Sequence, residues 1–486
     1  MKKLYVLLAA AVLGTMAVGQ STIYVDIDAS GNNDGSSWTN AYNELQNAIS
    51  SASVGDEIWV AEGTYYPTHD IIGNLNPTNP RTKTILINKN IAIYGGFTGA
   101  ETMLSQRDWS QNITLFSGDI GINGDLSDNC TRVVFVTSTS SLDGVYVQDA
   151  YVNAAYGGGI NINGATFSLT NCEVSNNASY SGAGLYIQGN SEVSIDNCEF
   201  LNNTAENKGG GIFLEQGSIN VLNSIFDGNE AGYGGGMSLE GGTATECKIV
   251  NCLFSNNQTT LYGGTAVFAY ALPGGVKVVN STFAKNDCPS CSPSNTGTIR
   301  SNGVNYSIQN SIIWNSVPFS EAANNLSVFT VNNSVATNGF SGTGNLSAYP
   351  LFTDTLSNDF TLQSTSVAID AGDTTGISDI IPSLDLNGNT RYFNSIDIGA
   401  FESTISSTGV SSIPSSQIHL YPNPTSGTIQ FTKKISQVKV YELNGRLVRS
   451  ISVNSNQVDL SFLSKGMYII EISSLELIHT ERIIVE

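Results

Sequence analysis

The sequence predicts an all-β protein: a right-handed parallel β-helix, or solenoid, followed by a small C-terminal Ig-like β-sandwich. Three observations lead to this fold class. Only 13% of the 486 residues are charged, which excludes a charge-rich disordered chain and a long coiled coil. The apolar residues come in short β-branched and aromatic runs broken by Gly and Asn, as in a protein of many short strands. In the middle of the chain these runs repeat.

The repeat is marked by an Asn that is followed at once by a small residue and, three positions on, by an apolar one. Successive marks are 23 to 30 residues apart, which is too short for a propeller blade of about 40 residues. Glycine pairs or triplets and a second Asn series keep the same phase. The marks are Asn171, Asn197, Asn223, Asn251, Asn280, Asn310 and Asn333, and the second series is Asn177, Asn203, Asn229, Asn257 and Asn286.

The residues around each mark predict strands that meet at a corner. Apolar and polar residues alternate before the Asn, as in a strand with one buried face, and the alternation shifts across it. Asn tolerates the left-handed backbone of a corner, and its amide can pair with the Asn of the next coil. The glycines fit corners where a Cβ would collide with the neighbouring coil. We therefore expect coils stacked about 4.8 Å apart, like residue over like.

These repeats resemble those of a known group of proteins. Gly159-Ile160 and Gly211-Ile212, each at the end of a glycine triplet, and the Phe-x-x-Asn pattern of Phe200 to Asn203 resemble the repeats of chlamydial polymorphic outer-membrane proteins and of pectin-lyase-like β-helix proteins. The resemblance covers roughly residues 130–340. It implies the fold and not the function, because adhesins, lyases and hydrolases share that fold.

The N-terminal region carries an export signal and the start of the solenoid. Lys2 and Lys3, an apolar run and Ala17-Val18-Gly19 predict a signal peptide over residues 1–19, with a retained anchor as the alternative. The β-helix is expected over 20–402. A helix at 41–52 is expected to cap its open end, and 55–65 is interpreted as its first strand.

The C-terminal region changes character after the repeats. The segment that ends in Asp397-Ile-Gly-Ala-Phe-Glu402 resembles the choice-of-anchor Q region, and the Ser/Thr-rich residues 403–416 are interpreted as a linker. Residues 417–486 contain a strand-turn-strand around Asn444-Gly445 and resemble the type A C-terminal sorting domain of Bacteroidetes type IX secretion cargo. This resemblance implies that the type IX secretion machinery handles the chain and leaves it at the outer-membrane surface or outside the cell. An ordinary accessory Ig-like domain is the alternative.

Charge excludes two classes of partner. The chain has 20 Lys and Arg against 41 Asp and Glu, a net charge of −21. Such a chain has no electrostatic reason to bind nucleic acid or anionic lipid. No run after the signal peptide is long enough to span a membrane. An acidic protein can still hold Ca²⁺, or bind anionic sugars through it.

The scarcity of histidine limits the possible catalysis. Of three His residues, none lies in the repeat, so a Ser-His-Asp triad or a His-bound metal has no residues to build it. The remaining enzymatic route for this fold is a lyase, in which Lys or Arg removes a proton beside a carboxylate that a cation neutralises. Lys248 and Lys277 are the candidates because both are expected to point outward on adjacent coils. Solvated surface lysines are the alternative.

Other side chains suggest binding or structural roles. Oxygen ligands gather around a Gly turn at Asp119, Asn123, Asp125 and Asp128, as in a calcium loop, although Asx-turns explain the same pattern. Cys288 and Cys291 are predicted to form a local disulfide, whereas Cys172 and Cys198 read as core fillers that could also bridge. A tyrosine recurs near the glycine corners, and we hypothesise that a column of such rings binds carbohydrate by stacking; packing of each ring against the glycine corner is the alternative. The tyrosines are Tyr156, Tyr180, Tyr233 and Tyr262.

The leading functional hypothesis is an exported adhesin or glycan-binding rod that contacts extracellular polysaccharide. Two alternatives remain: a cation-dependent lyase acting on a uronate polysaccharide, and a structural spacer that binds nothing. The sequence leaves the ligand and the oligomeric state open.

Overall fold

The computed structural model describes residues 20–241, 245–291, 297–315, 319–321, 327–337, 339–391, 395–403, 420–421, 425, 427–442, 446–473 and 478–485. It divides into two compact units, Met1–Ser407 and Thr408–Glu486, each of which is described by itself. The predicted signal peptide and most of the predicted linker lie outside the described residues. Within the described ranges, no helix is both long enough and apolar enough to cross a membrane.

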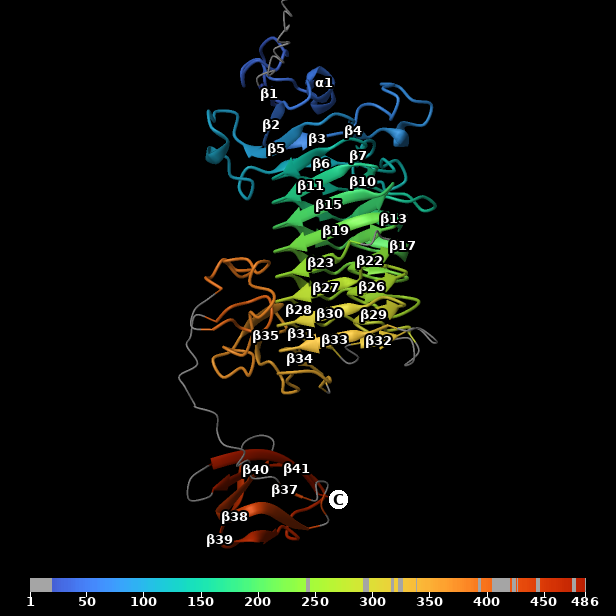
Figure 1. Cartoon of the computed structure of the whole chain (residues 1–486). Helices are drawn as coiled ribbons and strands as arrows, with labels where there is room; N and C mark the ends of the chain where they lie inside the picture. Colours follow the sequence, from blue (N-terminus) through green and yellow to red (C-terminus); the bar gives the residue numbers. More distant parts are fainter. Residues whose placement is uncertain are drawn as a thin grey trace, which may run out of the picture. The chain divides into compact units, whose positions relative to one another are not determined.

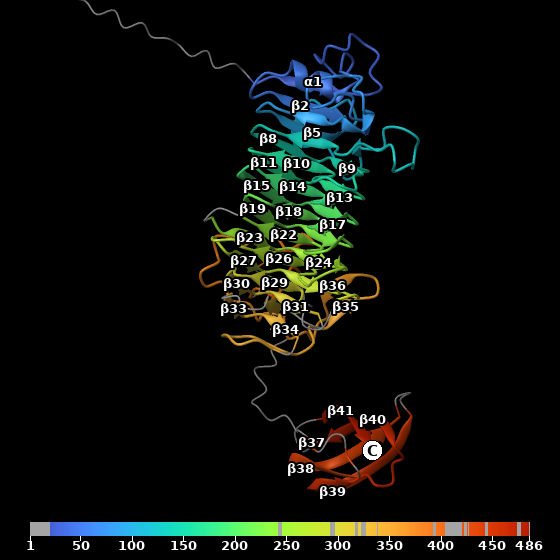
Figure 2. The ribbon, with the colours of Figure 1, turned by 90° about the vertical axis from the view of Figure 1, so that its right-hand side faces the viewer.

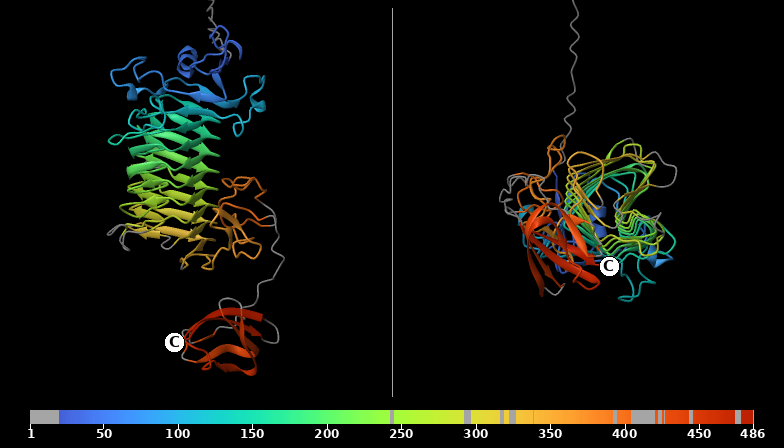
Figure 3. Two further views of the ribbon diagram at one scale, coloured as in Figure 1. Left: turned by 180° about the vertical axis from the view of Figure 1, so that it is seen from behind. Right: turned by 90° about the horizontal axis from the view of Figure 1, so that it is seen from below.

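The first unit is a parallel β-helix (Figure 1). Between the two ends of the solenoid, each coil passes through a strand of sheet A, one of sheet B, in four coils a short strand of sheet D, and one of sheet C. All pairings within these sheets are parallel. Seen along the axis, successive coils superimpose (Figure 3, right).

Sheet A consists of β1 (Thr22–Val25), β2 (Glu57–Ala61), β5 (Ala92–Phe97), β8 (Ser140–Asp143), β11 (Thr166–Thr170), β15 (Ser191–Asp196), β19 (Gly217–Leu222), β23 (Cys247–Val250), β27 (Val276–Val279), β30 (Tyr306–Gln309) and β33 (Phe329–Asn332). Sheet B consists of β3 (Gly63–Tyr65), β6 (Thr114–Ser117), β9 (Tyr146–Gln148), β12 (Glu173–Ser175), β16 (Glu199–Leu201), β20 (Ile225–Asp227), β24 (Leu253–Ser255), β28 (Thr282–Ala284), β31 (Ile312–Trp314) and β34 (Val335–Ala336). Sheet C consists of β4 (Ile85–Ile87), β7 (Val134–Val136), β10 (Ile160–Asn163), β14 (Leu185–Gln188), β18 (Ile212–Leu214), β22 (Met237–Glu240), β26 (Val267–Tyr270), β29 (Ile299–Asn302) and β32 (Phe319–Glu321). Sheet D consists of β13 (Ala178–Ser181), β17 (Thr204–Lys208), β21 (Glu230–Ala231) and β25 (Gln258–Thr259).

The predicted Asn corners are confirmed. All seven marking asparagines lie between sheets A and B with φ between 45° and 56°, the left-handed region in which Asn is favoured over other non-Gly residues. Their amides stack only in part. Asn197 donates to Asn171 (2.7 Å) and Asn251 to Asn223 (2.7 Å), but the amide of Asn223 turns to Asp196.

The solenoid interior is filled by columns of like residues. Phe200, Phe226, Phe254 and Phe283 stack with ring centroids 4.5–4.9 Å apart and planes within 9° of parallel. The glycine corners close as predicted. A Cβ on Gly211 would lie 2.6 Å from the carbonyl oxygen of Gly236, and one on Gly236 would lie 2.6 Å from that of Ala266. Any other residue there would therefore force neighbouring coils apart.

The N-terminal end differs from the expectation in two details. The capping helix α1 is shorter, Leu45–Ser51, because Tyr42 pairs with Val25 and the Asn43 amide bonds to carbonyls of the 26–29 loop. The predicted stripe of Ala41, Leu45, Ala48 and Ile49 is buried. The first strand is β1 and not 55–65, which forms β2 and β3. Two short 3-10 helices, η1 (Pro80–Thr82) and η2 (Leu104–Gln106), lie in side loops.

The chain closes by folding back along the solenoid. Residues 350–403, here named the closing segment, contain the hairpin β35 (Phe352–Asp354) and β36 (Asp359–Leu362) and lie beside the last coils (Figures 1 and 2). Phe352, Phe360 and Ile398 belong to one buried cluster with Leu253 and Ile312 of sheet B. The lower outer face of sheet B is therefore covered.

The second unit is a small antiparallel β domain with its own core. Its strands are β37 (Leu420–Tyr421), β38 (Thr428–Tyr441), β39 (Leu447–Asp459), β40 (Gly466–Ser473) and β41 (Ile478–Val485). The long β38 pairs with β37, β39 and β40, and β40 pairs with β41. The predicted hairpin joins β38 to β39, and its tip, residues 443–445, lies outside the described residues. Buried Ile429, Val438 and Ile470 belong to the core.

Candidate functional site

Two groups of aromatic rings lie where the chain turns into sheet C. In the upper group, Tyr156 stacks on Tyr186 (centroids 5.4 Å), which stacks on Phe213 (5.6 Å), and Tyr180 meets Tyr156 edge-on. The Lys208 amine lies 5.5 Å from the centre of the Phe213 ring and pairs with Glu240 at 2.7 Å. The Tyr186 hydroxyl donates to Glu215.

The lower group sits further along the same side. Tyr233 stacks on Tyr262 (centroids 4.9 Å) and tilts toward Phe268 (5.3 Å). The side chain of Tyr262 is 37% exposed and that of Tyr156 is 44% exposed. We name the two groups together the aromatic strip: Tyr156, Tyr180, Tyr186, Phe213, Tyr233, Tyr262 and Phe268.

The tyrosines do not form the single column that the repeat suggested. The register at this corner runs Tyr156, Ser181, Lys208, Tyr233, so two coils separate the two tyrosines. Tyr180 lies one residue ahead of that register. Coil length changes along the repeat, which moves each tyrosine relative to the corner. Tyr186, Phe213 and Phe268 were not predicted. They point outward on sheet C from the second position of its strands, but other groups cover them, and only 2–6% of their surface is exposed.

Lys248 and Lys277 are in register on β23 and β27, on the outer face of sheet A. Within the described ranges, neither makes an ion pair. The hollow on this face, about 450 Å³, is lined by short polar side chains such as Ser168, Ser194 and Asn220 and by neither lysine. The lysines are therefore stacked as expected but stand outside the hollow.

The acidic loop at 119–128 uses its carboxylates on its own backbone. Asp119 accepts from the Gly124 N–H (3.0 Å), Asp125 from Ser127 (2.9 Å) and Asp128 from Ile122 (2.7 Å), while Asn123 is exposed. No group of three His, Cys, Asp or Glu side chains in the described residues is arranged to hold a metal ion. An Asx-turn therefore accounts for the Asp125 contact alone, and Oδ1 of Asp119 and Oδ1 of Asp128 are buried with no hydrogen-bond donor in the described residues.

The cysteines divide into one bridge and a buried set. Cys288 and Cys291 form a disulfide, with Cα atoms 5.4 Å apart. Cys172 and Cys198 do not bridge; they fill inward slots with free thiols, as do Cys130, Cys247 and Cys252. Burial raises the pKa of Cys130 and of Cys252 to about 12, so both stay protonated and unreactive at neutral pH.

A cleft on the upper outer face of sheet B escaped the sequence analysis. Tyr146, Glu173 and Glu199 are in register on β9, β12 and β16, and Trp109 completes a cavity of about 160 Å³. Partial burial raises the pKa of Glu199, and the charges of Glu173 and Asp227 raise it further. The available signal was a Glu two positions after the marking Asn in two consecutive repeats. The cavity is smaller than the roughly 300–1,000 Å³ of typical ligand sites.

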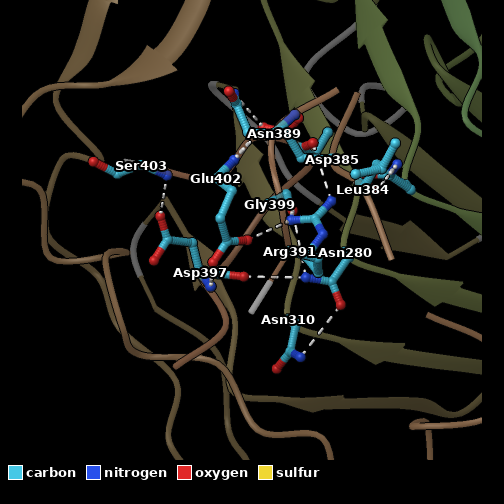
Figure 4. A network of polar contacts seen from close by, with 12 residues as sticks. Asn280, Asn310, Leu384, Asp385, Asn389, Arg391, Asp397, Gly399, Glu402 and Ser403 are labelled. Carbon is cyan, nitrogen blue, oxygen red and sulfur yellow. Dashed lines mark hydrogen bonds and ion pairs between the residues drawn. The ribbon is translucent and has the colours of Figure 1, made fainter. Parts of the chain in front are cut away.

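A buried polar network ties the closing segment to the solenoid (Figure 4). Arg391 is fully buried and donates to Glu402 (3.1 Å), to the carbonyl oxygens of Gly399 and Ala400 (both 3.1 Å) and to the Asn251 side chain. Asn280 donates to the carbonyl of Asp397 (3.0 Å). Asn310 exchanges two hydrogen bonds with the Asp373 backbone (both 2.9 Å), so three corner asparagines bond to the closing segment as well as to their own column.

The carboxylates of this network have structural partners. Asp385 accepts from the N–H groups of Asn387, Asn389 and Glu402, and Asp397 from those of Asp370 and Ser403. Burial raises the pKa of Glu402 to about 8 and that of Asp397 to about 6. These groups hold the closing segment in place.

Comparison with known families agrees with this architecture. Residues 121–313 match the family described as right handed beta helix region, and residues 419–486 match the secretion system C-terminal sorting domain. The protein is a β-helix that carries a type IX sorting domain. The sorting domain, the second unit, indicates export to the cell surface or the extracellular space and handling by the type IX secretion machinery.

Other comparisons add little to these two family matches. No curated protein matches the sequence. Among solved structures, pectate lyase Pel9A is 17% identical with a TM-score of 0.44, covering 79% of this chain and 96% of that chain. A rhamnogalacturonan lyase is 15% identical with a TM-score of 0.41, covering 79% of this chain and 97% of that chain. XylC in complex with xylose is 9% identical with a TM-score of 0.28, covering 95% of this chain and 100% of that chain. Likeness at this level carries no argument about activity.

Proposed function

We propose that this exported rod binds an extracellular polysaccharide along the aromatic strip and works as an adhesin or glycan-binding protein. The observation that carries the proposal is the exposure of stacked rings at a corner of the solenoid, at Tyr156 and Tyr262. Ring faces accept the apolar faces of sugars, and Tyr adds a hydroxyl that can hydrogen-bond. Gln188 and Glu215 lie beside the upper group and offer further polar contacts.

An extended strip suits a polymer better than the two hollows do. The sheet B cleft is too small for more than a fragment of a ligand, and the sheet A hollow has no lysine in its lining. Lyase chemistry needs a base inside the binding site. The position of Lys248 and Lys277 outside that hollow therefore favours binding over turnover.

Retention on immobilised polysaccharides tests the proposal. The triple variant Tyr156→Ala, Tyr233→Ala, Tyr262→Ala should lose retention, because it removes exposed rings from both groups. Tyr66→Ala is the matched control, since Tyr66 is 49% exposed but lies far along the chain from the strip. Absorbance of unsaturated products, followed with and without Ca²⁺, reports any lyase activity in the same samples.

The outcomes separate the three functions. Retention that survives in the triple variant would exclude the strip as the binding surface. Turnover that disappears in Lys248→Ala or Lys277→Ala would replace the proposal by the lyase. A protein that binds no polysaccharide in the panel would be a spacer.

A further inference from the structure

Arg300 is a buried cation that makes no ion pair with any side chain that the structure describes. It lies on β29, on the outer face of sheet C, in register with Phe268, and only 6% of its surface is exposed. Its guanidinium carbon lies 5.9 Å from the centre of the Tyr262 ring. Within the described part of the chain, no carboxylate lies within ion-pair distance of Arg300, and its Nη1 has no hydrogen-bond acceptor.

This arrangement is unusual in an acidic protein. The arginines with deeply buried side chains, Arg107 and Arg391, are paired, Arg107 with Asp143 (2.7 Å) and Arg391 with Glu402 (3.1 Å). A buried guanidinium is normally paired, because an unpartnered charge away from water carries a large desolvation cost. The chain has 41 acidic residues for 20 basic ones, so carboxylates are not scarce.

A second arginine repeats the arrangement at the other end of sheet C. The guanidinium carbon of Arg132 lies 5.0 Å from the centre of the Phe135 ring, again with no ion pair in the described residues. Arg132 lies two residues before the start of β7, and Arg300 lies on β29, six strands further along sheet C. At about 4.8 Å per strand the two sites are roughly 29 Å apart. The aromatic strip lies between them, so an arginine that makes no ion pair in the described residues lies near each end of the strip.

We infer that the glycan bound by the aromatic strip is acidic, and that Arg300 receives one of its carboxylate or sulfate groups. This inference rests on the proposed function. Arginine suits such groups because its planar N–H groups pair with two oxygens at once. Since Nη1 is enclosed, binding includes an outward rotation of the Arg300 side chain along the Tyr262 ring. The positive charge of Arg300 is then paired with an anionic group of the glycan and not with a carboxylate of the protein.

The test compares Arg300→Gln with Lys208→Gln in binding assays on polygalacturonate, dextran sulfate and neutral dextran. Both variants remove one positive charge from the same face, but Lys208 is already neutralised by Glu240. Arg300→Gln should weaken binding to an acidic polymer about tenfold or more, and Lys208→Gln much less. Loss on polygalacturonate identifies a carboxylate ligand, and loss on dextran sulfate a sulfate ligand.

A stability measurement guards against misfolding. Removing an unpartnered buried charge should leave the Tm of Arg300→Gln equal to or above that of the parent protein. An acidic polymer should raise the Tm of the parent and not that of the variant. Arg300→Lys keeps the charge but loses the two-oxygen geometry, so it should recover only part of the binding.

The same experiments distinguish glycan binding by the aromatic strip from the preference for acidic glycans through Arg300. If the tyrosine variant loses binding while Arg300→Gln keeps it, or if neutral dextran binds as well as the acidic polymers, the strip binds glycans but the acidic specificity is wrong. If no polymer binds the parent protein, the proposed function fails and this inference fails with it.

Discussion

The side-chain amide of Asn203 donates to that of Asn229, one coil further along the solenoid, over 3.0 Å. Asn229 Oδ1 also accepts the backbone N–H of Asn203 (3.1 Å), and its own amide continues to Asn257 (2.9 Å). The ladder extends from Asn177 to Asn286 in the turn that leaves sheet B, and most of its members are completely buried. Each rung satisfies backbone groups that water cannot reach, so the ladder fixes the spacing of the coils.

Replacement of Asn229 by alanine should lower the free energy of unfolding of the β-helix by about 3 kcal/mol or more. The change removes the oxygen that accepts both the backbone N–H and the side-chain amide of Asn203, and it removes the amide that donates to the Phe200 carbonyl. Each buried group left unsatisfied costs about 1–3 kcal/mol. Denaturant unfolding measures the loss. Asn153→Ala, at an exposed position, is the control and should change nothing. Equal stability of the two variants would mean that the ladder does not hold the coils together.

The repeat could be predicted because it is local and periodic. Each Asn corner, glycine corner and buried Phe recurs within about one coil, so sequence spacing reports spatial stacking directly. The left-handed backbone at Asn223 and the Phe226 stack both followed from that spacing. For the second Asn series, the sequence shows only that it keeps the phase of the repeat. The structure shows that it forms the continuous ladder, whereas the corner series is interrupted.

The closing segment could not be predicted in the same way. Arg391 meets Asn251, 140 positions away, and Asn280 meets Asp397, 117 positions away. No periodicity connects such residues, and the Asp and Glu of this segment had no visible partners in the sequence. For the same reason the sequence could not single out Arg300 among the basic residues. Whether an arginine has an acidic neighbour can be seen only in the folded structure.

Phe226→Ala should destabilise the β-helix by about 3–5 kcal/mol, the usual cost of removing a buried aromatic side chain. Its ring is fully buried and stacks on both Phe200 and Phe254, so the cavity cannot close without moving a neighbouring coil. Phe226→Leu keeps most of the volume and should lose less. Urea unfolding of the two variants measures both values. Equal losses in the two variants would show that the stacked ring, and not the volume of the side chain, stabilises this site.

The buried free thiols should resist modification while the protein is folded. The pKa of Cys247 is raised to about 11 by burial, and those of Cys130 and Cys252 to about 12, so little thiolate exists near pH 8. Iodoacetamide labelling followed by mass spectrometry should find these positions unmodified in the native protein and fully modified in denaturant. Labelling of Cys252 at the same rate in both conditions would contradict the buried column.

Stability of the β-helix should fall as the pH rises from about 5 to 8. Burial raises the pKa of Glu402 from its ordinary 4.5 to about 8 and that of Asp397 to about 6, so the folded protein keeps protons that the unfolded chain releases in this range. A state that binds more protons loses stability as they are removed. Glu402→Gln should flatten the slope of Tm against pH, because Gln cannot ionise. An unchanged slope in that variant would assign the dependence to other groups.

Deletion of residues 417–486 should trap the protein in the periplasm without unfolding the β-helix. The second unit has its own buried core, separate from that of the solenoid, so its removal exposes no β-helix interior. The sorting domain matches over residues 419–486, which the deletion removes entirely. Cell fractionation and surface proteolysis would locate the truncated protein, with Tyr66→Ala in the full chain as a folded control that should still reach the surface. Normal surface display of the truncated chain would show that export does not depend on this domain.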